Sequence, residues 1–382
     1  MNCTIIPIFI PHYGCPHACV FCNQRSITGQ EQVPDDAGIK ETIEKYLQTI
    51  AVPRGGHVEV AFYGGSFTAL GMDVQERYLR VVQPYIESGE VASVRVSTRP
   101  DAINSDILEL LRSYRVGSIE LGVQSLDDEV LQLAGRGYTV DQVWEAVALV
   151  KAEGFALGIQ LMLGLPGDTR EKDVQTARAV TGMKPDMARL YPALVIRDTR
   201  LAVMYRKGTY RPLSLEEAVV TAADMFVILE GAGTKVIRMG LQPTLDLTGG
   251  EALVAGPFHP SFGELVEAEV FLRQALAAIH AYGDRLPDSL CLFVNQRDAS
   301  KMIGHRGRNR KRLKEYWKTG ELSIVGIESP ERDWVGLGAS RQDLPRWVLH
   351  REEFYSMQEL VGSLKPAGEP AGGKVVTRVG KG

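Results

Sequence analysis

The sequence lacks several features that would place it in a specialised class. None of its 382 residues lies in an uninterrupted apolar run of the roughly 18 residues that a membrane-spanning helix needs. Residues 1–10 carry no basic segment ahead of their apolar stretch, which argues against a secretion signal and favours a strand. The formal net charge is only −4, so the chain is not basic over its whole surface. These absences predict a cytoplasmic globular protein.

Cysteine is scarce and unevenly distributed. The chain has five, an odd number, and three of them lie within eight residues, which does not suit a disulfide framework. We expect Cys3 and Cys291 to be ordinary core residues, since free cysteine packs well in protein interiors. With 45% hydrophobic residues, the chain can bury a core without disulfides, and its length predicts two or three domains or one barrel with an appendage. The clustered cysteines therefore need another explanation.

Short apolar segments alternate with amphipathic helical segments up to about residue 195. The pattern predicts six strands at Thr4–Ile10, Val58–Tyr63, Ser93–Ser97, Ser118–Gly122, Leu157–Leu163 and Met187–Tyr191. Six βα units in succession predict an α/β fold with a parallel sheet, here a partial barrel. Each strand leads directly into a polar or glycine-rich motif: HYGCPHACVFC, GGSFT, STRPD, GVQSLDD, GLPGDT and YPALV. These motifs should meet at the carboxyl ends of the strands, where such sheets build their sites.

Composition and periodicity predict four segments along the chain. We expect a partial barrel over 1–200, a helical and loop extension over 201–285 that packs on it, a small basic unit over 286–330, and a C-terminal segment over 331–382. The last segment becomes rich in Gly, Pro and Lys from about residue 365, which predicts disorder.

The three clustered cysteines, Cys15, Cys19 and Cys22, follow the first strand with the spacing C-x3-C-x2-C. Thiolates at this spacing can each bind a different iron of a 4Fe-4S cluster, and three ligands leave the fourth iron open for chemistry. A structural zinc site with His12 or His17 as its fourth ligand is the alternative, although such sites usually join two distant pairs of ligands.

With Phe21 before its last cysteine, this motif resembles the signature of radical S-adenosylmethionine (SAM) enzymes. FYGGSF resembles the glycine-rich segment that binds the amino group of the methionine moiety in that superfamily. The segments STRPDAI, ELGVQSLDDEVL and GIQLMLGLPGDT resemble the subgroup of the catalytic subunit of Elongator. The resemblance covers about residues 4–260. It implies a partial βα barrel, a 4Fe-4S cluster on the three cysteines, and SAM bound across the carboxyl ends of the strands.

The resemblance also implies roles for residues in the other loops. The cofactor-binding candidates are Phe21, Gly64, Gly65, Ser66, Arg99, Gln124 and Gly164. Arg99 either clamps the cofactor carboxylate or pairs with Asp101. Gln124 either meets the ribose or substrate or caps the following helix. Gly164 either lets the adenine lie against backbone or forms a simple turn.

The segment after residue 290 predicts a second binding surface. A GxxG loop joins a short helix to a basic one, with strands on either side at Leu290–Asn295 and Leu322–Ile327, which resembles the core of a KH module. Residues 297–318 contain nine Lys and Arg against two Asp and Glu, a net charge of +7. Such a stripe suits backbone phosphates, although a solvated basic helix is the alternative. The nucleic-acid-binding candidates are Gly304, His305, Arg306, Gly307, Arg308, Arg310 and Lys311.

His259, in the segment GPFHPSFG, is a further candidate. It either faces a substrate or is an ordinary loop residue bonded to backbone.

Together these features predict a function and its alternatives. The resemblance implies one-electron cleavage of SAM to methionine and a 5′-deoxyadenosyl radical, which then acts on a substrate in the barrel. In the resembling subgroup this chemistry serves wobble uridine of tRNA together with an acetyltransferase domain, for which we find no acetyl-CoA loop here. We therefore expect a tRNA base as substrate, a reductant such as flavodoxin or ferredoxin, and neither membrane nor DNA. The alternatives are a radical enzyme acting on a porphyrin-like metabolite, and a nucleic-acid-binding protein with a structural metal.

Overall fold

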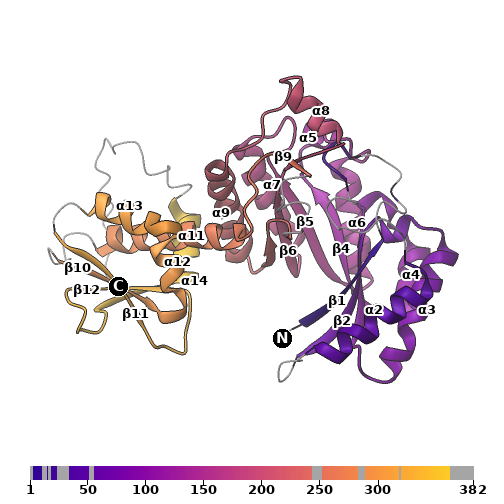
Figure 1. Ribbon diagram of the computed structural model, residues 1–382, viewed down its shortest axis with the longest axis horizontal. Coiled ribbons are helices and arrows are strands. Elements are labelled where there is room, and N and C mark those ends of the chain that lie inside the picture. Colours follow the sequence, from indigo (N-terminus) through magenta and orange to yellow (C-terminus); the bar gives the residue numbers. More distant parts are fainter. Residues whose placement is uncertain are drawn as a thin grey trace.

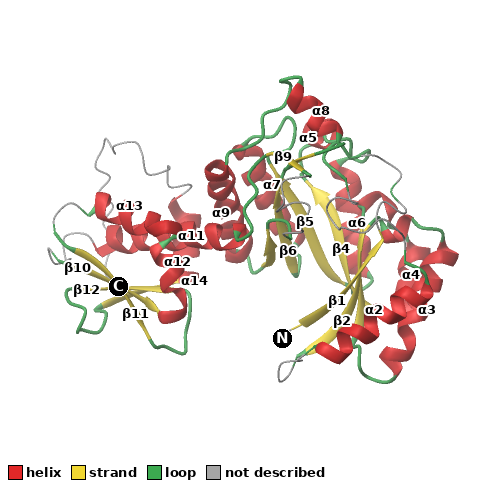
Figure 2. Cartoon of the chain, in the orientation of Figure 1, coloured by secondary structure: helices red, strands yellow, loops and turns green. Residues whose placement is uncertain are grey.

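The computed structural model describes residues 3–10, 15, 19–23, 34–50, 56–242, 252–282, 289–317 and 320–361. Figures 1 and 2 show a large α/β body and a smaller body, which lie on either side of the helices α9 (Leu215–Gly231) and α11 (Phe262–Tyr282). Within the described residues, no helix has the length and apolar character needed to cross a membrane.

The large body is built on one open sheet in which every neighbouring pair of strands is parallel. Its order is β1-β2-β3-β4-β5-β6-β8. The strands are β1 (Cys3–Ile10), β2 (His57–Gly64), β3 (Ser93–Thr98), β4 (Val116–Gln124), β5 (Ala156–Leu163), β6 (Met187–Pro192) and β8 (Lys235–Met239). The predicted partial barrel is confirmed. The seventh strand, β8, was not predicted: it lies in the expected helical extension, and its half-exposed edge position leaves it no continuous apolar run.

Helices cover the outer face of this sheet (Figure 2). They are α2 (Asp36–Thr49), α3 (Met72–Glu87), α4 (Ser105–Ser113), α6 (Val140–Ala152) and α7 (Arg170–Met183). A further short helix, α5 (Asp128–Leu133), lies at the carboxyl ends of the strands. Five of these six helices begin where a short polar side chain accepts a backbone N–H of the first turn, which fixes the start of a helix. These caps are Asp35, Asn104, Asp127, Thr139 and Thr169. The buried apolar faces of α2, α3, α4, α6 and α7 pack against the sheet and form the main core.

A network of buried charges ties four of the strands together. Arg95 of β3 lies between two carboxylates, 2.6 Å from Glu59 of β2 and 2.9 Å from Glu120 of β4. Glu120 also accepts from Arg189 of β6 at 2.7 Å, and Arg189 donates to the Tyr63 hydroxyl at 2.9 Å. Because each buried charge has an opposite partner, the network is tolerated in the interior. Removing one member would leave another charge buried without its full set of partners.

The smaller body contains a second sheet of order β11-β10-β12-β13, in which only β10 and β11 are parallel. Its elements are β10 (Leu290–Asn295), α12 (Ala299–Ile303), α13 (Arg308–Tyr316), β11 (Leu322–Ile327), β12 (Trp334–Gly338), β13 (Trp347–His350) and α14 (Arg351–Val361). The sheet therefore extends beyond residue 330, where we expected the basic unit to end, because β12 pairs with β10 and β13 pairs with β12. The segment predicted to be disordered, from about residue 365, lies outside the described residues.

A short ribbon and helix complete the large body. The strands β7 (Val195–Ile196) and β9 (Leu253–Ala255) pair antiparallel, and α8 (Arg200–Arg206) follows β7.

Replacing Glu120 with Ala should destabilise the half-barrel. The change leaves Arg95 and Arg189 buried without a shared carboxylate, and breaking a buried ion pair in this way typically lowers the free energy of unfolding by about 3–5 kcal/mol. Denaturant unfolding monitored by circular dichroism measures the loss, with Glu109→Ala on the exposed face of α4 as control. A loss below about 1 kcal/mol would contradict a structural role for the network.

Candidate functional site

The three predicted cluster ligands lie just beyond the carboxyl end of β1. Cys15, Cys19 and Cys22 are all half-buried, and the backbone N–H of Cys22 bonds to the carbonyl of Cys19 in a tight turn. The Cys15 sulfur lies 3.6 Å from the hydroxyl of Ser66 in the loop after β2. His12 and His17, the alternative zinc ligands, lie outside the described residues.

The path of the cysteine loop is fixed by two neighbouring helices. The N–H of Val20 donates to the carbonyl of Ala134 at the end of α5, and the carbonyl of Val20 accepts from Leu201 in α8, at 3.0 and 2.7 Å. Val20 itself is fully buried, and Phe21 packs between the apolar clusters around Leu165 and Leu201. These contacts hold the three thiols at the mouth of the half-barrel.

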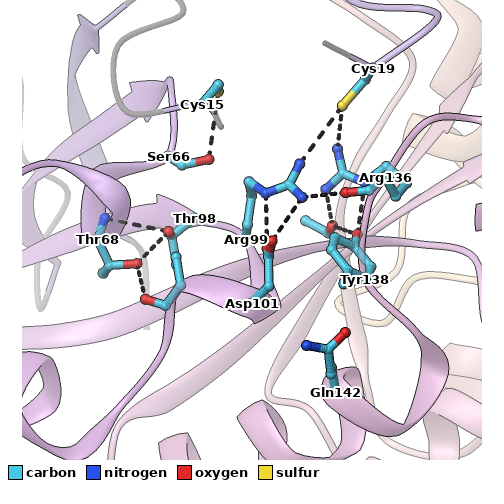
Figure 3. Close-up of polar contacts among 12 residues, drawn as sticks. Cys15, Cys19, Ser66, Thr68, Thr98, Arg99, Asp101, Arg136, Tyr138 and Gln142 are labelled. Atoms are coloured by element: carbon cyan, nitrogen blue, oxygen red, sulfur yellow. Dashed lines mark hydrogen bonds and ion pairs between the residues drawn. The ribbon is translucent and has the colours of Figure 1, made fainter. Parts of the chain in front are cut away.

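Arg136 is a site residue that sequence reasoning missed. Its buried guanidinium lies 2.9 Å from the Cys19 sulfur and also donates to the Gly122 carbonyl and the Tyr138 hydroxyl (Figure 3). Burial alone would lower the pKa of Arg136, but Tyr138 and Cys19 outweigh it and raise that pKa, so the side chain stays charged. The segment AGRGYT, an arginine between two glycines in the loop after α5, is the sequence signal that could have identified it.

Arg99 pairs with Asp101, which was the second of the two arrangements predicted for it. Its guanidinium binds both carboxylate oxygens of Asp101, at 2.9 and 3.0 Å, and donates to the backbone carbonyl of Arg136 (Figure 3). The pair lies in the interior because Arg99 is almost fully buried. One of its nitrogens still lies 3.9 Å from the Cys19 sulfur, so two cations face this thiol.

The glycine-rich loop after β2 packs against the end of β1. Gly64 has a φ of +101°, and a Cβ there would lie 3.2 Å from the Ile10 carbonyl oxygen, which also accepts the N–H of Gly65. Only glycine fits this close approach of backbone to backbone. Ser66, the third predicted residue of this loop, is buried and lies next to Cys15. The predicted amino-group subsite and the cysteine loop are therefore in contact.

Gln124 does not cap the following helix, because that cap is Asp127. Instead Gln124 is buried at the end of β4, where its side-chain oxygen accepts from Gln160 at 3.4 Å. Its φ of +71° is rare for a residue with a side chain, and such strain clusters at functional sites. This geometry favours the predicted role in binding ribose or substrate.

Gly164, after β5, lies next to the carboxyl groups of Asp168 and Asp173. Its N–H donates to Asp173 at 3.4 Å, and its carbonyl accepts from Tyr210. Burial, followed by the nearby charge of Asp168, raises the pKa of Asp173 well above its usual range, and burial raises that of Asp168. Among the described residues, the buried Oδ2 atom of Asp168 has no donor, and a proton on Asp173 would supply one. We infer that the two carboxyl groups share a proton.

The predicted GxxG loop joins α12 to α13, as expected. Gly304 has a φ of +75°, and a Cβ there would lie 2.9 Å from the backbone nitrogen of Asn309. Beside the loop the surface is hollowed by about 610 Å³, lined by Arg306, Gly307, Arg310, Lys311, Lys314 and Glu315. We call this hollow the basic groove; Lys314 was not predicted to belong to it. Of the other candidates, Gly304 is buried, His305 is exposed, and Arg308 pairs with Glu216 of α9.

Comparison with known proteins identifies the family. Residues 9–180 match the radical SAM superfamily, and residues 185–271 match the radical SAM C-terminal domain, together about two thirds of the chain. The chain belongs to the radical SAM superfamily. Its predicted fold, enzyme class and cofactors are thereby confirmed: this is a radical SAM enzyme whose cofactors are a 4Fe-4S cluster and SAM.

Several relatives belong to the predicted subgroup. The tRNA uridine(34) acetyltransferase of Methanocaldococcus jannaschii is 28% identical over 303 residues, 69% of this chain and 54% of the relative. Elongator complex protein 3 of Bos taurus is 26% identical over 281 residues, 62% of this chain and 51% of the relative. The chain thus spans about half the length of the curated relatives it matches. The archaeal Elp3 structure from Methanocaldococcus infernus shares the fold, with a TM-score of 0.56 and 22% identity over 74% of this chain and 63% of that one.

The residues of the radical SAM site fit both cofactors. Three half-buried thiols lie on one loop, and the guanidinium groups of Arg136 and Arg99 lie 2.9 and 3.9 Å from the Cys19 sulfur, where they can donate hydrogen bonds to a cluster ligand. The bare backbone of Gly64 and Gly65 lies beside this loop and offers a cofactor close approach.

Replacing Arg136 with Met should lower the midpoint potential of the cluster in the absence of SAM. A charge-assisted hydrogen bond to sulfur is worth about 1.5–3 kcal/mol, which corresponds to about 60–130 mV for one electron. A redox titration monitored by EPR measures the shift, with the exposed Arg112→Met as control. An unchanged potential would show that Arg136 does not stabilise the cysteine loop electrostatically.

Replacing Asp173 with Asn should change the pH dependence of stability. Because the pKa of Asp173 is higher in the folded than in the unfolded protein, folding takes up a proton between the two values, and stability falls as pH rises through this range. In the variant, the free energy of unfolding should no longer decrease with pH over this range. At pH 8 it should exceed the wild-type value by about 1.4 kcal/mol for each unit by which the pKa differs between the folded and unfolded protein. Denaturant unfolding at pH 5 and pH 8 tests this against the exposed control Asp343→Asn. Parallel pH profiles for wild type and Asp173→Asn would exclude the shared proton.

Proposed function

We propose that this enzyme cleaves SAM reductively at a 4Fe-4S cluster bound by Cys15, Cys19 and Cys22, and uses the radical to modify a tRNA base, specifically wobble uridine. The observation that carries the proposal is the contact of the cysteine loop with the loops after β2, β3 and β4 at the carboxyl ends of the strands. No single one of these loops would suffice, because SAM has to be held at several points while one bond breaks.

Each loop has a separate task in this proposal. The thiolates of Cys15, Cys19 and Cys22 would hold the cluster, and SAM bound there would supply the radical chemistry. Gly64, Gly65 and Ser66 offer backbone and hydroxyl groups to the methionine end. Arg136 supplies the positive charge that a carboxylate needs, whereas the charge of Arg99 is paired with Asp101. Gln124 binds ribose or substrate through its amide, and Gly164 lets the adenine lie against backbone. Phe21 anchors the cysteine loop between the apolar clusters around Leu165 and Leu201.

The RNA part of the proposal has two supports. Relatives matched over more than half of this chain are named tRNA uridine(34) acetyltransferases. In addition, the basic groove presents Arg306, Arg310, Lys311 and Lys314 with Glu315 as its single acidic lining residue, which suits a phosphate backbone. A KH-like loop that clamps nucleic acid is consistent with both.

Anaerobically reconstituted protein tests the radical step. We expect about four irons and four sulfides per chain, and formation of 5′-deoxyadenosine and methionine after reduction by dithionite or flavodoxin. Cys19→Ala should lose the cluster and the products, whereas Cys291→Ala, buried in the smaller body, should keep both. A colourless protein that holds zinc would contradict the radical step.

Mass spectrometry of nucleosides from tRNA tests the substrate. Transfer RNA from a strain that lacks the gene should gain a modified uridine when incubated with the enzyme, SAM and reductant. If SAM is cleaved and no tRNA nucleoside changes, the substrate proposal is wrong and a small metabolite becomes the substrate to seek.

A further inference from the structure

Two segments connect the mouth of the half-barrel to the basic groove. The first follows the β7–β9 ribbon: Gly256, with a φ of +114°, packs against the backbone of Ala193 and Leu194 just after β6. Only a few residues further on, His259 contacts His305 of the GxxG loop, with 5.4 Å between their ring centroids. One short loop therefore links the carboxyl end of β6 to the groove.

The second connection starts at the predicted adenine loop. A Cβ on Gly164 would lie 2.7 Å from the side chain of Leu213, so Leu213 packs against one side of this glycine. Three residues later Glu216, in the first turn of α9, pairs with Arg308 beside the GxxG loop. Three residues of chain span at most about 11 Å, so this distance and the side chains of Glu216 and Arg308 separate Leu213 from the backbone next to Gly307 of the groove.

His259 carries a hydrogen-bond donor of fixed identity at this junction. Its Nδ1 atom accepts the backbone N–H of Ser261 at 3.1 Å, which places the proton of the neutral ring on Nε2. Burial, followed by the neighbouring His305, lowers the pKa of His259, whereas Glu264 opposes this shift. The half-buried ring is therefore a neutral donor at pH 7. This suits a phosphate or ribose oxygen, and the bond to Ser261 agrees with the backbone-bonded loop residue expected from sequence.

We propose that the basic groove and the barrel mouth form one path for single-stranded RNA, on which the Nε2–H of His259 donates a hydrogen bond to the RNA backbone. The inference rests on the proposed function and adds the form of the RNA and its route. A base that enters the half-barrel must leave its stack, and GxxG loops clamp single strands, so a loop or unpaired segment fits where a duplex does not. The cations of the groove hold the phosphates on one side of the target nucleotide.

Fluorescence anisotropy with the full-length protein tests the path. The probes are a labelled 12-nucleotide oligouridine RNA and a labelled RNA duplex of equal length, at 50 and 150 mM salt. We expect the single strand to bind more tightly than the duplex, and His259→Ala to weaken its binding by about tenfold or more, the worth of one hydrogen bond to a charged group. The matched control, His280→Ala at the exposed end of α11, should bind like wild type.

A second variant separates RNA contact from loop folding. In His259→Asn, the side-chain oxygen can still accept the N–H of Ser261, but the donor at the position of Nε2 is lost. We expect this variant to weaken RNA binding as much as His259→Ala does. Wild-type affinity in His259→Asn, or equal affinity of wild type for duplex and single strand, would overturn the path.

SAM cleavage by the wild type without RNA, measured in parallel, keeps the two proposals distinguishable. If the wild type cleaves SAM and His259→Asn binds RNA normally, only the path fails. If the wild type binds neither RNA at 50 mM salt, the path and the tRNA substrate both fail, whereas the radical step stands or falls with 5′-deoxyadenosine formation.

Discussion

A parallel strand reaches its neighbour only through a crossover connection, so all six loops that follow β1 to β6 begin at the same edge of the sheet. The cysteine loop depends on this constraint more than any other element. It takes its backbone partners from α5 and α8, and its buried cation, Arg136, from the loop after α5. Segments more than 100 residues apart in sequence thus place one short loop. The interior ion network of Arg95, Glu120 and their partners holds the strands that carry those segments.

Strand and helix periodicity predicted the half-barrel well because most of its strands are buried on both faces, and such strands stand out as short apolar runs between amphipathic helices. The same criterion failed for β8, whose residues are half-exposed at the sheet edge. It also failed for β12 and β13, which are short and form a sheet with β10 only through tertiary pairing. Periodicity describes local burial and cannot show which distant strand will be the partner.

The candidate site divides in a similar way. Cysteines and glycines were predictable, because their spacing reflects the chemistry of one loop. Pairings across loops were not. The folded backbone determines that Arg99 pairs with Asp101. Arg136 contacts Cys19, which lies 117 residues away in sequence. The raised pKa values of Asp168 and Asp173 likewise arise chiefly from burial of the two groups together. Sequence motifs therefore predicted which loops matter, and the fold determined how their charges are paired.

The central claim is that the loops at the carboxyl ends of the strands hold SAM directly on a cluster bound by Cys15, Cys19 and Cys22. Pulsed electron-nuclear double resonance on the reduced protein with SAM that carries ¹⁵N in its amino group tests it most directly. If the claim holds, the ¹⁵N nucleus couples to the cluster spin, and the coupling is absent when unlabelled SAM is used. A reduced cluster whose spectrum is unaffected by SAM, with no ¹⁵N coupling, would contradict the claim.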